Sequence, residues 1–139
     1  MPDYQITVKR VYDEIDKKDG TRLLTDRVWP RGIKKADLQL SDWLPDVCPA
    51  TSLRKAWHQG VIDYHEFCQQ YRQQLCQHPA VLLPIMKAAR QGPVTLLTAV
   101  KTTQRTHIPV LKSAILEALS NEDQANNNRP SQSLVCFGD

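Results

Sequence analysis

Basic side chains occur at the ends of the three stretches of this chain that read most clearly as β-strands. Arg10 ends the first stretch, Arg27 and Arg31 follow the second, and Lys101 follows the third. Guanidinium groups bind carboxylate and phosphate through paired hydrogen bonds, and a lysine adds a point charge. In open α/β sheets, ligands bind at the carboxyl ends of the strands. These four residues therefore predict a pocket for a small phosphate or carboxylate, provided that the strands are parallel.

Asp26 and His107 are the candidates for proton transfer in this pocket. Thr106 can cap a final helix, which places His107 in its first turn, where the helix dipole disfavours the charged imidazole. A neutral imidazole can act as an acid or a base. Asp26 is a candidate general base, but the neighbouring cations stabilise its charged form and favour an orienting role. The alternative is structural: Asp26 pairs with Arg27 or Arg10, and His107 is a surface residue without a role.

Hydrophobic periodicity predicts the elements that position these residues. Residues 4–10 and 22–26 read as strands, and residues 94–100 form a near-continuous apolar run that is typical of a central strand covered on both faces. Helices are predicted over residues 52–58, from Asp63 to about Leu75, over 81–89 and from Thr106 to Leu119. No long periodic element is visible in residues 27–51, and we expect this segment to cover the site.

Length and composition predict one soluble domain. The chain has 139 residues, of which 41% are hydrophobic and 24% charged. Residues 1–119 are predicted to form a single α/β domain, and residues 120–139 a low-complexity, disordered tail. The apolar residues near its end are consistent either with a docked strand or with a loose segment. No apolar run is long enough for a membrane helix and the N-terminus lacks a signal-peptide pattern, so we expect a cytoplasmic protein without a membrane partner.

The motif content argues against metals and common cofactors. The four cysteines, Cys48, Cys68, Cys76 and Cys136, form no CxxC pair and have no histidine at zinc-finger spacing, so they are read as reduced thiols. No glycine-rich dinucleotide or P-loop motif is present, and no cofactor or metal is predicted. A net charge of +3 is too small to require nucleic acid as the partner.

Several segments resemble the YeaO-like branch of the bacterial domain of unknown function 488 family. They are KRVYD, DGTRLLTDRVWPRGIKK, LRKAWH, DYHEFCQQY and VTLLTAVK, in that order, and DRVWPRG is the most specific. The resemblance implies a small three-layer, Rossmann-like α/β domain with a short, mostly parallel sheet flanked by helices, and it implies no settled activity. His107 matches the histidine of a Cys-His-Arg signature in the wider family. Its neighbours here are Thr106 and Ile108, so cysteine-dependent chemistry is in doubt.

These observations lead to one leading hypothesis and two alternatives. The leading hypothesis is a pocket that binds, or acts on, a small phosphorylated or nucleotide-like ligand. The first alternative is a nucleic-acid-binding module that uses the basic loop from Arg27 to Lys35. The second is a protein-interaction module whose partner covers residues 27–51. The sequence predicts neither whether the protein is an enzyme nor its oligomeric state.

Overall fold

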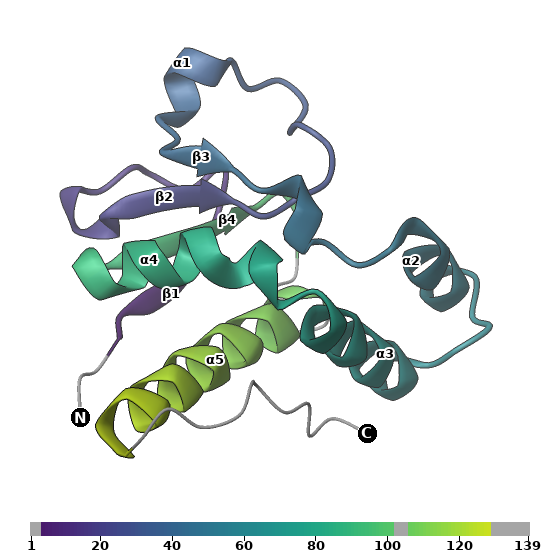
Figure 1. The fold of residues 1–139 in the computed structure, drawn as a ribbon. Helices are drawn as coiled ribbons and strands as arrows, with labels where there is room; N and C mark the ends of the chain where they lie inside the picture. The colour runs from purple at the N-terminus through teal and green to yellow at the C-terminus, as the bar shows by residue number, and fades with distance from the viewer. Residues whose placement is uncertain (1–3, 102–105, 129–139) are drawn as a thin grey trace.

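The computed structural model describes residues 4–101 and 106–128, which form four strands, five α-helices and three short 3-10 helices (Figure 1). The strands are β1 (Ile6–Arg10), β2 (Thr21–Leu24), β3 (Asp42–Trp43) and β4 (Val94–Thr98). The α-helices are α1 (Lys35–Leu38), α2 (Thr51–His58), α3 (Tyr64–Gln77), α4 (Leu83–Gln91) and α5 (Ile108–Asn128). The 3-10 helices are η1 (Lys17–Asp19), η2 (Pro45–Val47) and η3 (Pro79–Leu82). Within the described ranges, no helix is long and apolar enough to cross a membrane.

The sheet is parallel throughout, with the strand order β1-β4-β2-β3. This confirms the prediction of a Rossmann-like α/β fold with helices flanking a short sheet. Residues 94–98 are all buried, so the near-continuous apolar run is the central strand β4, as predicted. The link from β1 to β2 is shorter than the usual crossover between adjacent parallel strands. The two strands are parallel but not adjacent, because β4 lies between them. The carboxyl ends of β1, β4 and β2 therefore meet at one edge.

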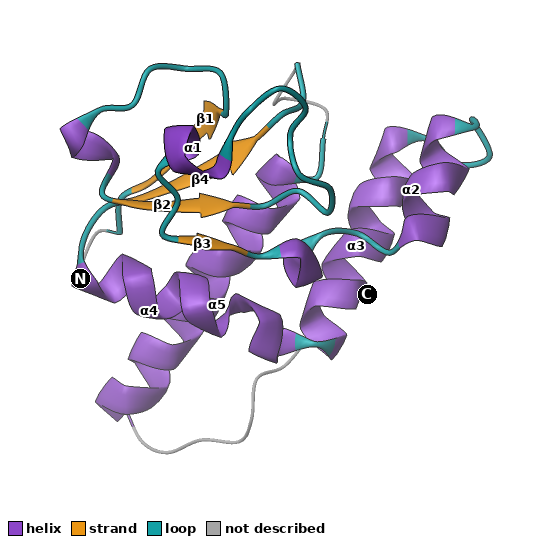
Figure 2. Ribbon diagram, turned by 90° about the horizontal axis from the view of Figure 1, so that it is seen from above, coloured by secondary structure: helices purple, strands orange, loops and turns teal. Residues whose placement is uncertain are grey.

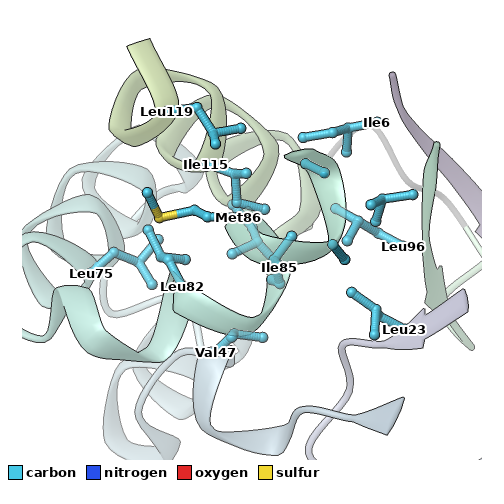
Figure 3. Close-up of a cluster of buried hydrophobic side chains, with 14 of the residues drawn as sticks. Ile6, Leu23, Val47, Leu75, Leu82, Ile85, Met86, Leu96, Ile115 and Leu119 are labelled. Carbon is cyan, nitrogen blue, oxygen red and sulfur yellow. The ribbon is translucent and has the colours of Figure 1, made fainter. Parts of the chain in front are cut away.

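Two hydrophobic clusters cover the two faces of the sheet, and adjacent strand residues alternate between them. Leu23 and Leu96 belong to the larger cluster, which includes side chains of α3, α4 and α5 (Figure 3). Leu24 and Leu97 belong to the smaller one, which α1 and its flanking loops cover. Figure 2, seen from above, shows α1 in front of the sheet. One layer is thus built of long helices and the other mainly of loop.

The C-terminal part of the described chain differs from the prediction of a disordered tail after residue 119. Helix α5 continues to Asn128. Arg90 at the end of α4 pairs with Glu122 at 2.7 Å and with Asp123 at 2.8 Å. The hydroxyl of Tyr4 also donates to Asp123, at 2.6 Å. These contacts stabilise a helical turn whose sequence has no apolar periodicity. Residues 129–139 lie outside the described residues.

The segment from residue 27 to 51 also contains more structure than its sequence predicted. Besides α1 it forms β3, a two-residue edge strand that pairs with β2. Trp43 in this strand is 38% exposed because β3 lies at the edge of the sheet. Trp29 packs edge-to-face against it, with ring centroids 5.6 Å apart. The indole N–H of Trp29 donates to the Ile33 carbonyl at 2.7 Å, so this tryptophan anchors its own loop.

Candidate functional site at the carboxyl edge of the sheet

Asp26 joins the ends of β2 and β4. Its carboxylate accepts one hydrogen bond from the Thr98 hydroxyl at 2.7 Å and another from the Ala99 backbone N–H, also at 2.7 Å. Thr98 is the last residue of β4, so Asp26 holds the backbone where that strand ends. Both carboxylate oxygens are engaged, which suits an orienting role better than proton abstraction.

His107 immediately precedes α5 and is directed at the end of β2. Its Nε2 lies 2.7 Å from the carbonyl oxygen of Thr25. A carbonyl only accepts, so Nε2 carries the proton. Burial lowers the pKa of His107 below its usual 6.5, although the Thr25 carbonyl and the Asp26 carboxylate oppose this shift. The imidazole is therefore neutral near pH 7, and desolvation is the main cause, rather than the helix dipole.

The second ring nitrogen of His107 remains available. Nδ1 makes no hydrogen bond within the described part of the chain. In the same part of the chain no buried side-chain nitrogen or oxygen lacks a partner, so Nδ1 must reach solvent. Because Nε2 holds the proton, Nδ1 can only accept a hydrogen bond. Asp26 does not orient the ring through a hydrogen bond, because its Oδ1 is 3.9 Å from Nε2.

Cys48 and Tyr71 complete the buried side of this site. The Cys48 thiol donates to the same Thr25 carbonyl at 3.1 Å. Burial raises the pKa of this thiol to about 12, with a smaller contribution from the Asp26 charge. The Tyr71 ring lies edge-on to His107, with centroids 6.2 Å apart, and its hydroxyl donates to the Val47 carbonyl at 2.5 Å. The sequence pointed to neither residue, and a thiol of this kind is a poor nucleophile.

Arg10 and Lys101 lie on the other side of the same edge. The Arg10 Nε donates to the Val100 carbonyl at 3.0 Å, next to exposed Lys101. The Arg10 guanidinium also lies over the Tyr12 ring, 5.1 Å from its centroid. The Tyr12 hydroxyl donates to the Arg31 carbonyl at 3.4 Å. These contacts bring the Arg10 side chain to the backbone just before Lys101, and Tyr12 to the backbone of Arg31.

Arg27 points elsewhere. Its Nη2 donates to the Pro49 carbonyl at 2.9 Å and to the Cys48 carbonyl at 3.3 Å. These bonds tie the loop after β2 to the segment before α2. The contacts of Arg27 are therefore with the loop that holds Cys48, whereas Arg10 donates to the backbone at the end of β4, beside Lys101.

The ion pairs of the protein are distributed unevenly around the sheet. Lys9 and Arg22 share buried Asp19, and on the helical layer Arg72 pairs with Glu117. Arg90 pairs with two carboxylates on α5. The four cations predicted to bind an anion have no carboxylate partner within the described residues, and the same is true of exposed lysines elsewhere, such as Lys17: the four are Arg10, Arg27, Arg31 and Lys101. The carboxyl edge thus carries cations that the described part of the protein does not neutralise.

His58 lies apart from this site, and part of the turn after β4 is not described. His58 is exposed at the end of α2 and packs edge-on against Trp57, with centroids 5.0 Å apart. Residues 102–105, most of the turn between Lys101 and the last helix, lie outside the described residues. Among the residues that are described, no group of three or more histidine, cysteine or acidic side chains is placed to hold a metal ion.

Comparisons with known proteins identify the family. The chain is 46% identical to the uncharacterised protein YeaO of Escherichia coli over 106 residues, which are 76% of this chain and 92% of YeaO. It is 37% identical to the uncharacterised protein Rv3073c of Mycobacterium tuberculosis over 107 residues, which are 77% of this chain and 90% of that protein. No solved structure matches significantly. A family model described as the inactive DUF488-N3 subclade matches residues 5–138, and the chain belongs to this family.

Proposed function

We propose that this protein binds a small phosphorylated or carboxylate-bearing molecule at the carboxyl edge of its sheet without converting it chemically. The proposal rests chiefly on where two basic residues lie: Arg10 ends β1 and Lys101 follows β4, and neither has a carboxylate partner within the described residues. Lys9, Arg22, Arg72 and Arg90 each pair with a carboxylate, whereas the cations of the carboxyl edge do not. An anion that replaced the missing partner would form charge-assisted hydrogen bonds with Arg10 and Lys101, and it would lie near the carboxyl ends of β1 and β4.

The protonation state of His107 indicates which second functional group the ligand contains. A neutral imidazole with an accessible, unprotonated Nδ1 offers a hydrogen-bond acceptor beside the cations. An acceptor does not bind a fully ionised oxyanion, but it does bind a hydroxyl group or the remaining proton of a singly ionised phosphate. The ligand that fits both features is a phosphorylated molecule with a hydroxyl group close to its phosphate, such as a sugar phosphate or a nucleotide.

Three observations favour binding without turnover. The Cys48 thiol, which shares the Thr25 carbonyl with His107, is held protonated by burial. Thr106 stands beside His107 in place of the cysteine expected from the wider family signature. The carboxylate of Asp26 is occupied by two hydrogen bonds from the backbone and side chain at the end of β4. The description of the family as inactive agrees with this picture.

Calorimetric titration and thermal shift with inorganic phosphate, sugar phosphates and nucleotides test the proposal. One class should stabilise the protein, and Lys101→Ala and Arg10→Ala should each weaken its binding about tenfold or more. Lys17→Ala is the matched control, because Lys17 is an exposed lysine in η1, which precedes the amino end of β2. Equal binding by all variants would exclude this edge as the site. Turnover of the bound compound would contradict the non-catalytic part of the proposal.

Salt dependence separates this function from nucleic-acid binding. The affinity of a protein for duplex DNA falls with salt with a log–log slope of about −0.9 for each phosphate that the protein contacts, whereas binding of one small anion is less sensitive. Stabilisation by oligonucleotides alone, lost on adding salt, would favour the basic loop from Arg27 to Lys35 as a nucleic-acid interface. Trp29 in that loop is half-buried and hydrogen-bonded to it, which makes it a poor stacking platform.

A further inference from the structure

An apolar groove lies between α3, η3 and α5, on the helical layer of the protein. Its lining consists of Arg72, Leu75, Cys76, Pro79, Leu82, Ala114, Glu117, Ala118 and Asn121. Leu75 and Leu82 are buried and belong to the main core, as Figure 3 shows. Arg72 and Glu117 form an ion pair that links α3 to α5. The groove is thus an open extension of the core, lined by one stripe of each helix.

The size of the groove limits what can occupy it. Its cavity volume is about 50 Å³. Pockets for drug-sized ligands measure about 300–1,000 Å³. This groove has room for one or two side chains, and its apolar lining calls for aliphatic or aromatic ones. A short apolar peptide segment therefore fits the groove better than a small-molecule ligand.

We propose that the groove is the docking site of this chain's own segment Leu134–Phe137. This segment, LVCF, is the apolar stretch that follows α5 after five intervening residues, Arg129 to Ser133. Docking would bury its apolar side chains against Leu75, Leu82 and Ala118, and so extend the hydrophobic core. The match to the family model extends to residue 138 and so includes this segment.

The connecting chain is long enough for this arrangement. Asn121 lines the groove and is seven residues before Asn128, where α5 ends. Seven helical residues correspond to about 10 Å along the axis. The linker from Asn128 to Leu134 spans up to about 20 Å when extended. Pro130 follows closely after the end of the helix, where a proline commonly stops a helix and lets the chain turn back.

Two native cysteines provide the test. Cys76 lines the groove and Cys136 lies within the docking segment. In an extended segment Leu134 and Cys136 face the same side, so both would contact the groove. Diamide removes two electrons and two protons from a pair of thiols and leaves a disulfide. Treatment of the full chain, followed by mass spectrometry of its tryptic peptides, should reveal an intramolecular disulfide between Cys76 and Cys136.

Matched variants decide the outcome. Replacing Leu134 by aspartate should abolish the disulfide and speed alkylation of Cys136 in the native protein. Replacing Ser131 by aspartate adds the same charge to the linker and should leave both readouts unchanged. Equal crosslinking of Cys136 to Cys68, which is on α3 but outside the groove, would overturn the proposal. So would a crosslink that forms only between two chains, because the groove would then bind the segment of another copy.

Discussion

His107 and Asp26 lie close together without forming a catalytic pair. The nearest ring nitrogen is 3.9 Å from the carboxylate, whereas it is 2.7 Å from the carbonyl oxygen of Thr25. The histidine is therefore oriented by the backbone at the end of β2, and the aspartate by the end of β4. Both residues fix the backbone at the carboxyl edge through these hydrogen bonds. Nδ1 of the histidine is the atom of the pair that can accept a hydrogen bond from a ligand.

Asp26→Ala should destabilise the protein by about 1–3 kcal/mol, because it leaves the Ala99 N–H and the Thr98 hydroxyl without their acceptor. Asp26→Asn should cost much less, since the amide oxygen can accept from Ala99 while the Thr98 hydroxyl rotates to accept from the amide. Urea unfolding measures both. If Asp26 is an orienting group, Asp26→Asn should also retain anion binding. A loss of binding with unchanged stability would instead give its charge a direct role.

The free energy of unfolding should fall as the pH drops through about 6.5. Burial lowers the pKa of His107 in the folded protein, so the unfolded chain takes up a proton first and is favoured at acid pH. The contribution is fully present above the unfolded pKa and is lost below it. His107→Gln should flatten this dependence, because a neutral amide N–H can still reach the Thr25 carbonyl. His65→Gln, on the exposed face of α3, is the control and should leave the slope unchanged.

Cys48 should resist alkylation in the native protein. With a pKa of about 12, its thiol is ionised only to about one part in ten thousand at pH 8, and it is also buried. Iodoacetamide should therefore modify Cys48 only after denaturation, and mass spectrometry of peptides can follow the reaction. Cys68, which is partly buried on α3, provides the internal comparison. Rapid modification of native Cys48 would reopen the question of thiol chemistry at this site.

Gly20→Ala should destabilise the protein far more than Gly60→Ala. Both glycines have positive φ, of 66° and 79°, so each replacement strains the backbone by about 1–2 kcal/mol. At Gly20 an added Cβ would also overlap the Pro93 carbonyl oxygen, which accepts the hydrogen bond from the Thr21 N–H that begins β2. At Gly60 the space is open. Thermal unfolding of the two variants measures the difference, and similar losses would contradict the close packing at Gly20.

Local patterns in the sequence were sufficient to predict most of the fold. The apolar run at residues 94–98 predicted a central strand, and it is buried throughout. A helix was predicted to begin at Asp63, and the Asp63 carboxylate caps α3 by accepting from the Glu66 N–H at 2.8 Å. Both features can be predicted locally. A strand buried on both faces has consecutive apolar residues, and a helix cap involves residues within one turn of each other. A parallel sheet then brought the carboxyl ends of its strands to one edge, where the basic residues had been expected.

Only the tertiary structure decided which side chains meet. Cys48 and His107 both contact the Thr25 carbonyl, although they are far apart in the sequence. The residues around each of them do not predict this shared contact. Arg27 and Arg10 both follow or end a predicted strand, yet Arg27 binds carbonyls before α2, whereas Arg10 at the end of β1 donates to the Val100 carbonyl after β4. Hydrophobic periodicity reports which face of an element is buried. It does not report which distant polar group lies opposite, because packing of the whole chain determines that.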